Sequence, residues 1–354
     1  MAEPFTAAKL PGTSVFAPPY PPSWVDHLTT WVDSLPMPWW MFYVLVAVLL
    51  NGVLAVGLWA SKVYATHGFH PMQIWLPTLA AYLLAFMHGM DRLARRAMVR
   101  FRPSFAGSEA DLDRVVYRLT TLPRRTSLLL SFVLAPVLLP LGLAEFRYTQ
   151  TGGLEAVPGI FVAVLLVLYA VSFVWVYHVF HQLREIRRLF RDHAVVHLEN
   201  VRPMYALSGV TAFTGIGIAI FNYGWLLAQP GLDPINPVTI GESLFSLGMA
   251  LVVFIWPLWG AHRKLSEAKD AAQAELAARK RDARNRVYQA VASGDLASVS
   301  PLNQVLGVMQ AEAADLGAVP TWPWSPGTLR NLVGAVMLPV VLWLIQYGLQ
   351  RLIE

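Results

Sequence analysis

The sequence predicts an all-α, polytopic membrane protein with seven transmembrane helices and a cytosolic antiparallel helical hairpin. Of the 354 residues, 56% are hydrophobic and only 14% are charged, and the mean hydropathy is positive, as is typical of multi-spanning membrane proteins. Seven separate segments are apolar over the about 20 residues that a helix needs to cross a bilayer. A charged block, residues 261–325, separates the last two segments. The chain has no cysteine, which excludes disulfides and thiolate metal sites.

Residues 1–38 are expected to form a proline-rich cytosolic tail. The prolines deny the backbone a regular helix before Ser23. Ser23 is placed to cap a short helix in which Trp24 and Trp31 share one apolar face and Asp26 lies off that face. We expect this helix to lie in the membrane interface.

Residues 39–260 are expected to hold six spans and residues 326–354 the seventh. The seven segments are Trp39 to Ala60, Met72 to Met90, Ser127 to Phe146, Val157 to Phe180, Met204 to Leu227, Ile240 to Trp259 and Leu329 to Leu349. Prolines such as Pro77, Pro257 and Pro339 predict bends, and Pro339 is the candidate hinge of the last span. The fifth segment carries four glycines, a small-residue surface that fits either packing within one subunit or a contact between subunits.

Lysine and arginine residues predict the orientation, because positive loops stay on the cytoplasmic side. The loops after the second and fourth segments and the block 261–325 together hold twenty-two of them, whereas the other three loops hold only Lys62 and Arg147. We therefore predict a protein of the cell membrane whose N-terminus is cytosolic and whose C-terminus is outside. The same distribution explains the basic net charge as topology, so no nucleic-acid partner is expected.

The cytosolic segments are predicted to be helical. The fourth span should continue in helical register from Gln182 to Asn200, and Ser108 with Asp111 forms a capping box for a short helix before the third span. The sixth span meets no helix breaker before Gly294 and should run on to that residue. It would then form the outgoing helix of the hairpin.

The returning helix of the hairpin is expected to begin at Ser300, with Pro301 in its first turn, and to end at Gly317. Its apolar residues are spaced three and four apart, as in a coiled coil. At 1.5 Å per residue it covers about 24 Å, against about 50 Å for the outgoing helix. We expect residues 317–325, rich in proline and tryptophan, to form an extended strap that covers the difference. Movement of the hairpin would then pull on the last span.

Four polar residues near the cytosolic ends of the second and fourth spans are the main metal candidates. They are His88, Asp91, His178 and His181. Each pair has a spacing of three, which can place two ligands on one helix face. The alternative is interfacial side chains that reach toward water and headgroups. We expect no bound metal and no cofactor. Since the sequence has no phosphate-binding glycine loop, HExxH or GxSxG motif, it does not predict an enzyme.

Polar residues within the apolar segments are the better functional candidates, because each costs free energy unless it meets a partner or water. They are Asn51, Asn222, Tyr223, Gln346 and Tyr347. If the last span lines a pore, Gln346 would contact a passing ion below an acidic outer mouth. That mouth would be formed by Glu145, Asp233 and Glu242. Hydrogen bonds between helices of one subunit are the alternative.

This architecture resembles the insect odorant and gustatory receptor channels. Those proteins also have seven spans, an inside N-terminus, fourth and sixth helices extended into the cytosol, and a cytosolic segment before the last helix. Residues 338–347 end in Gln346-Tyr347 and are similar to the family's Thr-Tyr through Gln-Phe signature, although the Thr-Tyr pair is absent. The resemblance implies a tetramer packed through its cytosolic extensions, with the last helix lining a cation pore. Residues 31–43 and 320–329 also resemble bacterial multi-pass proteins, for which no activity is implied.

The sequence therefore predicts a homo-oligomeric ion channel or channel-like receptor that conducts cations. The expected partners are the lipid bilayer, further copies of the chain, and a small ion or small ligand. A secondary transporter is one alternative, although no internal repeat is visible. A membrane scaffold or sensor that binds a cytosolic partner through the hairpin is the other.

Overall fold

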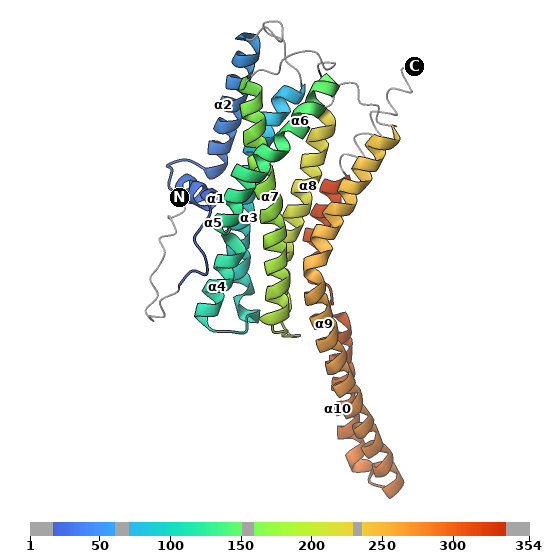
Figure 1. The fold of residues 1–354 in the computed structure, drawn as a ribbon. Helices are drawn as coiled ribbons and strands as arrows, with labels where there is room; N and C mark the ends of the chain where they lie inside the picture. The colour runs from blue at the N-terminus through green and yellow to red at the C-terminus, as the bar shows by residue number, and fades with distance from the viewer. Residues whose placement is uncertain (1–16, 61–70, 151–158, 229–235, 338–354) are drawn as a thin grey trace.

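The computed structural model describes residues 17–60, 71–150, 159–228 and 236–337 (Figure 1). Over these ranges the chain is helical and forms no β-strand, only two isolated β-bridges. The prediction of an all-α fold is therefore confirmed.

The helices of the described part follow one another with short connections. They are α1 (Trp24–Asp33), α2 (Trp39–Ala60), α3 (Pro71–Phe101), α4 (Glu109–Thr120), α5 (Arg124–Leu129), α6 (Ala135–Gln150), α7 (Gly159–Asp192), α8 (Ser208–Ala228), α9 (Pro237–Ser293) and α10 (Leu296–Ala318). A π-helical turn, η2 (Leu130–Leu134), joins α5 to α6 without a break, and the 3-10 turns η1 (Arg102–Ser104) and η3 (Arg202–Tyr205) precede α4 and α8. A last helix begins at Pro326 and is described as far as Met337.

Five helical stretches of the described part are long and apolar enough to cross a membrane. They are Trp39–Ala60, Arg124–Ala144, Gly159–Asp192, Arg202–Ala228 and Thr239–Ser293. Their large apolar side chains are widely exposed; Val48, Phe132 and Phe245 are 66%, 72% and 70% exposed. Such a surface suits contact with lipid. The structure thus has the features of a multi-pass membrane protein.

Two of the seven predicted spans are not among these five. The seventh lies mostly outside the described residues. The second lies in α3, which includes the polar residues Gln73, His88 and Asp91, and these lower its hydropathy. α3 can include these polar residues because it lies inside the bundle. It packs against α2, α7 and α8, and Leu83, Met87 and its other core residues are buried. A helix surrounded by helices can carry polar groups that find protein partners.

Glycines of α8 allow it to lie close to α3. A Cβ added at Gly217 would come within 2.1 Å of the Phe86 ring, and one at Gly224 within 2.0 Å of the Trp75 ring. Ser208, Thr211 and the other small polar residues of α8 are buried as well. These glycines therefore pack within the subunit.

Several predicted helix ends are confirmed. α4 begins with the capping box of Ser108 and Asp111, and α9 ends one residue before Gly294, whose φ is +78°. The helix of the fourth span, α7, ends at Asp192 and not at the predicted Asn200, because residues 193–195 hydrogen-bond to the backbone of residues 104–106. The returning helix starts earlier than predicted, at Leu296, because the Asp295 side chain accepts a hydrogen bond from the Ser298 N–H and caps it there. Ser300 and Pro301 therefore lie inside α10.

The lower part of α9 and all of α10, residues 266–318, form a structure that we call the arm. Figure 1 shows α9 bending between its upper and lower parts, and Pro257 lies inside this helix. The same view shows α10 alongside the lower part of α9, extending beyond the end of the bundle where α4 lies. Leu276 and Ala283 of α9 are buried in the arm. With 23 residues, α10 covers about 34 Å, so the strap spans less distance than the sequence suggested.

Candidate functional site

Residues 20–33, which we call the clasp, pack against the segment that joins α4 to α6. The Arg124 N–H donates a hydrogen bond to the Pro21 carbonyl at 3.1 Å, and the Trp24 indole N–H donates to Ser131 Oγ at 3.1 Å. Ser23 caps α1, as predicted. The face that meets the protein holds Val25, Asp26, Thr29 and Val32, whereas Trp31, on the predicted apolar face, is 51% exposed.

Asp26 can be buried because three donors meet one of its oxygens. Oδ2 accepts hydrogen bonds from the Ser23 N–H at 2.7 Å, the Ser23 hydroxyl at 2.7 Å and the Leu122 N–H at 3.1 Å. Burial nevertheless raises the pKa of Asp26 above its ordinary value, and these hydrogen bonds oppose that rise. The Asp26 carboxylate therefore joins α1 to the backbone after α4.

Two tyrosines add to this contact. The Tyr20 hydroxyl donates to the Thr121 carbonyl at 2.9 Å, and the Tyr117 hydroxyl donates to the Tyr20 carbonyl at 2.7 Å. Burial raises the pKa of both phenols. Both side chains therefore remain neutral donors at any physiological pH.

His88 lies between the clasp and α2. The Tyr43 hydroxyl donates to Nδ1 at 3.0 Å, and Nε2–H donates to Asp33 Oδ1 at 3.1 Å. These partners fit an imidazole whose hydrogen is on Nε2. Arg92 also pairs with Asp33, and its guanidinium lies over the Trp39 ring at 6.0 Å. The arrangement links α1, α2 and α3.

Asp91 faces α7 and forms a second, fully buried arrangement. Its Oδ1 accepts from His178 Nε2 at 2.9 Å and from Gln182 Nε2 at 3.4 Å, and Gln182 Nε2 also donates to the Leu119 carbonyl at 3.1 Å. Asp91 and His178 are 4% and 2% exposed. His178 Nδ1 and Gln182 Oε1 are buried and have no hydrogen-bond partner among the described residues, which is uncommon in proteins.

The four metal candidates thus divide between separate arrangements. His181 Nε2 donates to the Arg118 carbonyl at 2.8 Å and does not join Asp91. In the part of the chain that the structure describes, no group of three or more His, Cys, Asp or Glu residues is placed to hold a metal ion. The spacing of three places each pair on one helix, but His88 contacts α1 and α2 whereas Asp91 contacts α7.

Of the predicted polar residues within the spans, Asn51 has the best-defined partners. Its Nδ2 donates to the Ala47 carbonyl at 2.8 Å and to Thr78 Oγ1 at 2.9 Å, so it joins α2 to α3 within the subunit. Asn222 and Tyr223 are half-buried in α8, and Glu242 is exposed near the start of α9. The side chain of Glu145 and residues Asp233, Pro339, Gln346 and Tyr347 lie outside the described part of the structure.

The strap, residues 319–325 in the structure, is folded onto α9. His262 Nδ1 donates to the Thr321 carbonyl at 3.1 Å, and its ring stacks on Trp322 with a centroid distance of 3.9 Å. Trp322 stacks on Trp324 at 4.4 Å, and Trp324 contacts Phe254 at 5.2 Å. At the arm end, Lys269 Nζ donates to the Gly317 and Val319 carbonyls at 2.7 and 2.8 Å. The strap therefore lies along α9 from Lys269 to Phe254, with bends at residues 321–323.

The last helix begins directly after the strap and packs into the core of the bundle. Ser325 Oγ accepts a hydrogen bond from the Thr328 N–H at 3.1 Å and caps this helix. Leu332 and Val336 then join the buried cluster that includes Ala250 and Phe254 of α9. The start of the last helix is thus fixed against α8 and α9.

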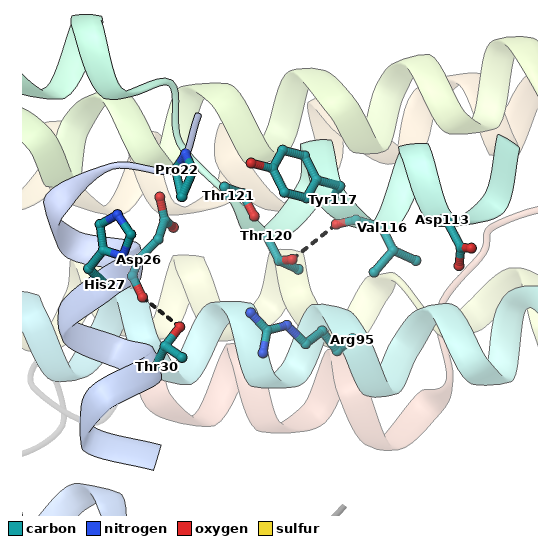
Figure 2. Close-up of a pocket in the computed structure, with 10 residues that line it drawn as sticks. All are labelled: Pro22, Asp26, His27, Thr30, Arg95, Asp113, Val116, Tyr117, Thr120 and Thr121. Atoms are coloured by element: carbon teal, nitrogen blue, oxygen red, sulfur yellow. Dashed lines mark hydrogen bonds between the residues drawn. The ribbon is translucent and has the colours of Figure 1, made fainter. Parts of the chain in front are cut away.

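A cavity of about 430 Å³ lies between α1, α3 and α4. Figure 2 shows its lining, with Asp26 and Thr30 from α1, Arg95 from α3, and residues of α4 opposite. The lining residues are Pro22, Asp26, His27, Thr30, Arg95, Asp113, Val116, Tyr117, Thr120 and Thr121. Eight of these ten residues have polar or charged side chains.

Sequence reasoning found few of these contacts. Tyr43 and Asp33 lie 45 and 55 residues from His88 in the sequence, so no local spacing links them. Asp26 could have been identified, because the Ser23-x-x-Asp26 spacing is that of a capping box.

No family model matches this chain, and neither a curated protein nor a solved structure matches it.

Proposed function

We propose that this chain is a subunit of a homo-oligomeric cation channel of the cell membrane, in which the arm assembles the subunits and the last span lines the pore. The observation that carries the proposal is the continuity of α9, the arm, the strap and the last helix. The strap is bonded to α9 at Lys269 and His262. The last helix begins immediately after it and packs on α9 through Leu332. The device that would assemble subunits is therefore directly joined to the helix that would line the pore.

The proposed topology has seven spans, with α3 and the helix after Ser325 added to the five apolar stretches. The burial of α3 supports its inclusion, since a helix surrounded by protein need not be uniformly apolar. Figure 1 places α4, the C-terminal end of α7 and the arm at the same end of the bundle. These elements carry 12 of the 27 arginines and lysines, which favours a cytosolic position for the arm and the N-terminus.

The geometry also supports a pore between subunits. Asn51 meets its partners within the subunit, and the cavity described above is bounded by α1, α3 and α4. Neither feature provides a path for an ion through a single subunit. The intramembrane candidates of the last span, Gln346 and Tyr347, would meet across the axis of an oligomer.

Two measurements test the proposal. Mass photometry of the purified full-length protein should give a discrete homo-oligomer, and a variant that lacks residues 266–318 should be monomeric. Proteoliposomes should release Na⁺ or K⁺ but not Cl⁻, and the Gln346→Ala substitution should alter the flux. A monomeric wild-type protein, or liposomes that stay tight with the intact oligomer, would refute the channel. An oligomer that does not conduct but binds a cytosolic protein through the arm would favour a scaffold.

A further inference from the structure

The cavity between α1, α3 and α4 is distinct from the arm and the last span. Arg95 lies one turn of α3 beyond Asp91, past the predicted end of the second span at Met90. The cavity thus opens at the level where a membrane-spanning helix meets the headgroup layer. Its chemistry can be worked out from the hydrogen bonds of its walls, whether or not the protein conducts ions.

Three of the four hydroxyl groups that line the cavity already donate their hydrogens within the protein. Thr30 donates to the Asp26 carbonyl at 2.7 Å, and Thr120 donates to the Val116 carbonyl at 3.0 Å; Figure 2 marks both bonds. Tyr117 donates to the Tyr20 carbonyl. A hydroxyl oxygen whose hydrogen is engaged can only accept. These hydroxyl oxygens are therefore suited to a ligand that donates hydrogen bonds.

The charged groups of the cavity add to this pattern. Asp26 uses only Oδ2 in its hydrogen bonds, and neither Oδ1 nor the Asp113 carboxylate has a partner among the described residues. Arg95 likewise has no ion pair in the described part of the chain, and Figure 2 shows its guanidinium extending along the cavity toward Thr30. The carboxylates would repel an isolated anion, whereas the guanidinium would repel an isolated cation. A molecule that carries both charges can pair with the guanidinium and with a carboxylate at the same time.

We propose that this cavity binds a small zwitterion with the chemistry of phosphoethanolamine, its phosphate on Arg95 and its primary ammonium on Asp26. A guanidinium suits phosphate because its N–H groups match the phosphate oxygens. The ammonium supplies three N–H donors to the carboxylate and threonine oxygens. Such a group is available either as the free compound or as the headgroup of an aminophospholipid, and the position of the cavity suits both.

Calorimetric titration of the full-length protein in detergent tests the inference with three soluble probes. Phosphoethanolamine should bind about tenfold or more tightly than phosphocholine, because a quaternary ammonium has no N–H to donate and a charge-assisted hydrogen bond is lost. Inorganic phosphate should bind weakly, since it has no ammonium group to pair with a carboxylate of the cavity. Native mass spectrometry from nanodiscs that mix ethanolamine and choline lipids tests the headgroup. Retention of ethanolamine lipid alone would assign the headgroup as the source.

Matched variants locate the binding. Arg95→Gln and Asp26→Asn should each weaken binding about tenfold, whereas Arg96→Gln, on the next position of α3 and outside the cavity, should leave it unchanged. Thermal unfolding should show that all three variants fold. Equal affinity for phosphoethanolamine and phosphocholine would overturn the proposal, as would equal weakening by Arg96→Gln. Binding of neither the soluble probe nor the ethanolamine lipid would overturn it as well.

Discussion

Removal of the Asp26 carboxylate should detach the clasp while the bundle stays folded. In Asp26→Ala the N–H groups of Ser23 and Leu122 lose their shared acceptor, and both lie at a buried contact. An unsatisfied buried donor costs about 1–3 kcal/mol, and loss of a helix cap about 1 kcal/mol. The burial cost of the carboxylate itself, seen in its raised pKa, offsets part of this loss. The expected net change is about 2–4 kcal/mol of local stability.

Hydrogen exchange measures this change directly, because amides in a locally opening segment exchange in proportion to its open population. Since about 1.4 kcal/mol is a factor of ten, amides of residues 27–33 should exchange about 30- to 700-fold faster in Asp26→Ala. Asp26→Asn keeps an oxygen acceptor at this position and should stay near the wild-type rate. Asp113→Asn, in the same cavity but without such bonds, is the control. The reasoning fails if Asp26→Ala exchanges like the wild type, or if Asp26→Asn is as fast as Asp26→Ala.

The raised pKa of Asp26 also gives this exchange a pH dependence. The folded clasp binds the proton more tightly than the detached clasp does, so protonation stabilises the closed form. The stability of the clasp should therefore be highest below the pKa of the exposed carboxyl, about 3.9, and should fall as the pH rises through the raised value. After correction for the intrinsic exchange rate, Asp26→Asn should lack this component. The same dependence in both proteins would assign it to another group.

Three further predictions concern the bundle and the strap. Asp91→Leu should lower the thermal stability by the equivalent of about 3–5 kcal/mol, because it leaves His178 buried without its partner. The double variant Asp91→Leu/His178→Leu should recover much of this loss. If the losses of stability in the two single variants simply added in the double variant, the pair would not interact. Gly217→Ala should lower the stability of the fold by about 1–3 kcal/mol, because the added Cβ would overlap the Phe86 ring. Gly209→Ala is the control, because the space around Gly209 is open. Equal melting temperatures of the two variants would refute the close approach of α8 to α3. Replacement of Pro320–Trp324 by glycine and serine should preserve any oligomer but abolish regulated flux in a conducting protein, and unchanged regulation would refute coupling through the strap.

Local patterns predicted the helices well, because caps and breakers act over a few residues. Ser23, Ser108 and Gly294 mark helix ends in the structure where their chemistry indicated. Asp295 was overlooked as a cap, and the start of α10 was placed too late as a result. A helix end depends on a choice between neighbouring caps, which the sequence alone does not settle.

The buried face of α1 shows why the site was harder to predict than the helices. Trp24 and Trp31 are the more hydrophobic side chains, yet the opposite face is buried, because Asp26 there finds the Leu122 N–H. That partner is 96 residues away in the sequence. Hydrophobic spacing identifies a face suited to lipid or core, but a tertiary hydrogen bond decides which face meets the protein.

The position of the strap changes how the arm could act on the last helix. An extended tether would transmit only a pull, but His262, Trp322 and Trp324 hold the strap along α9 on both sides of Pro257. The last helix then packs on α9 through Leu332, close to the same segment. A change in the bend of α9 would therefore carry the strap and the start of the last helix with it. On the proposed function, the proline in α9 is a better candidate than the strap itself for the point at which arm movement reaches the pore.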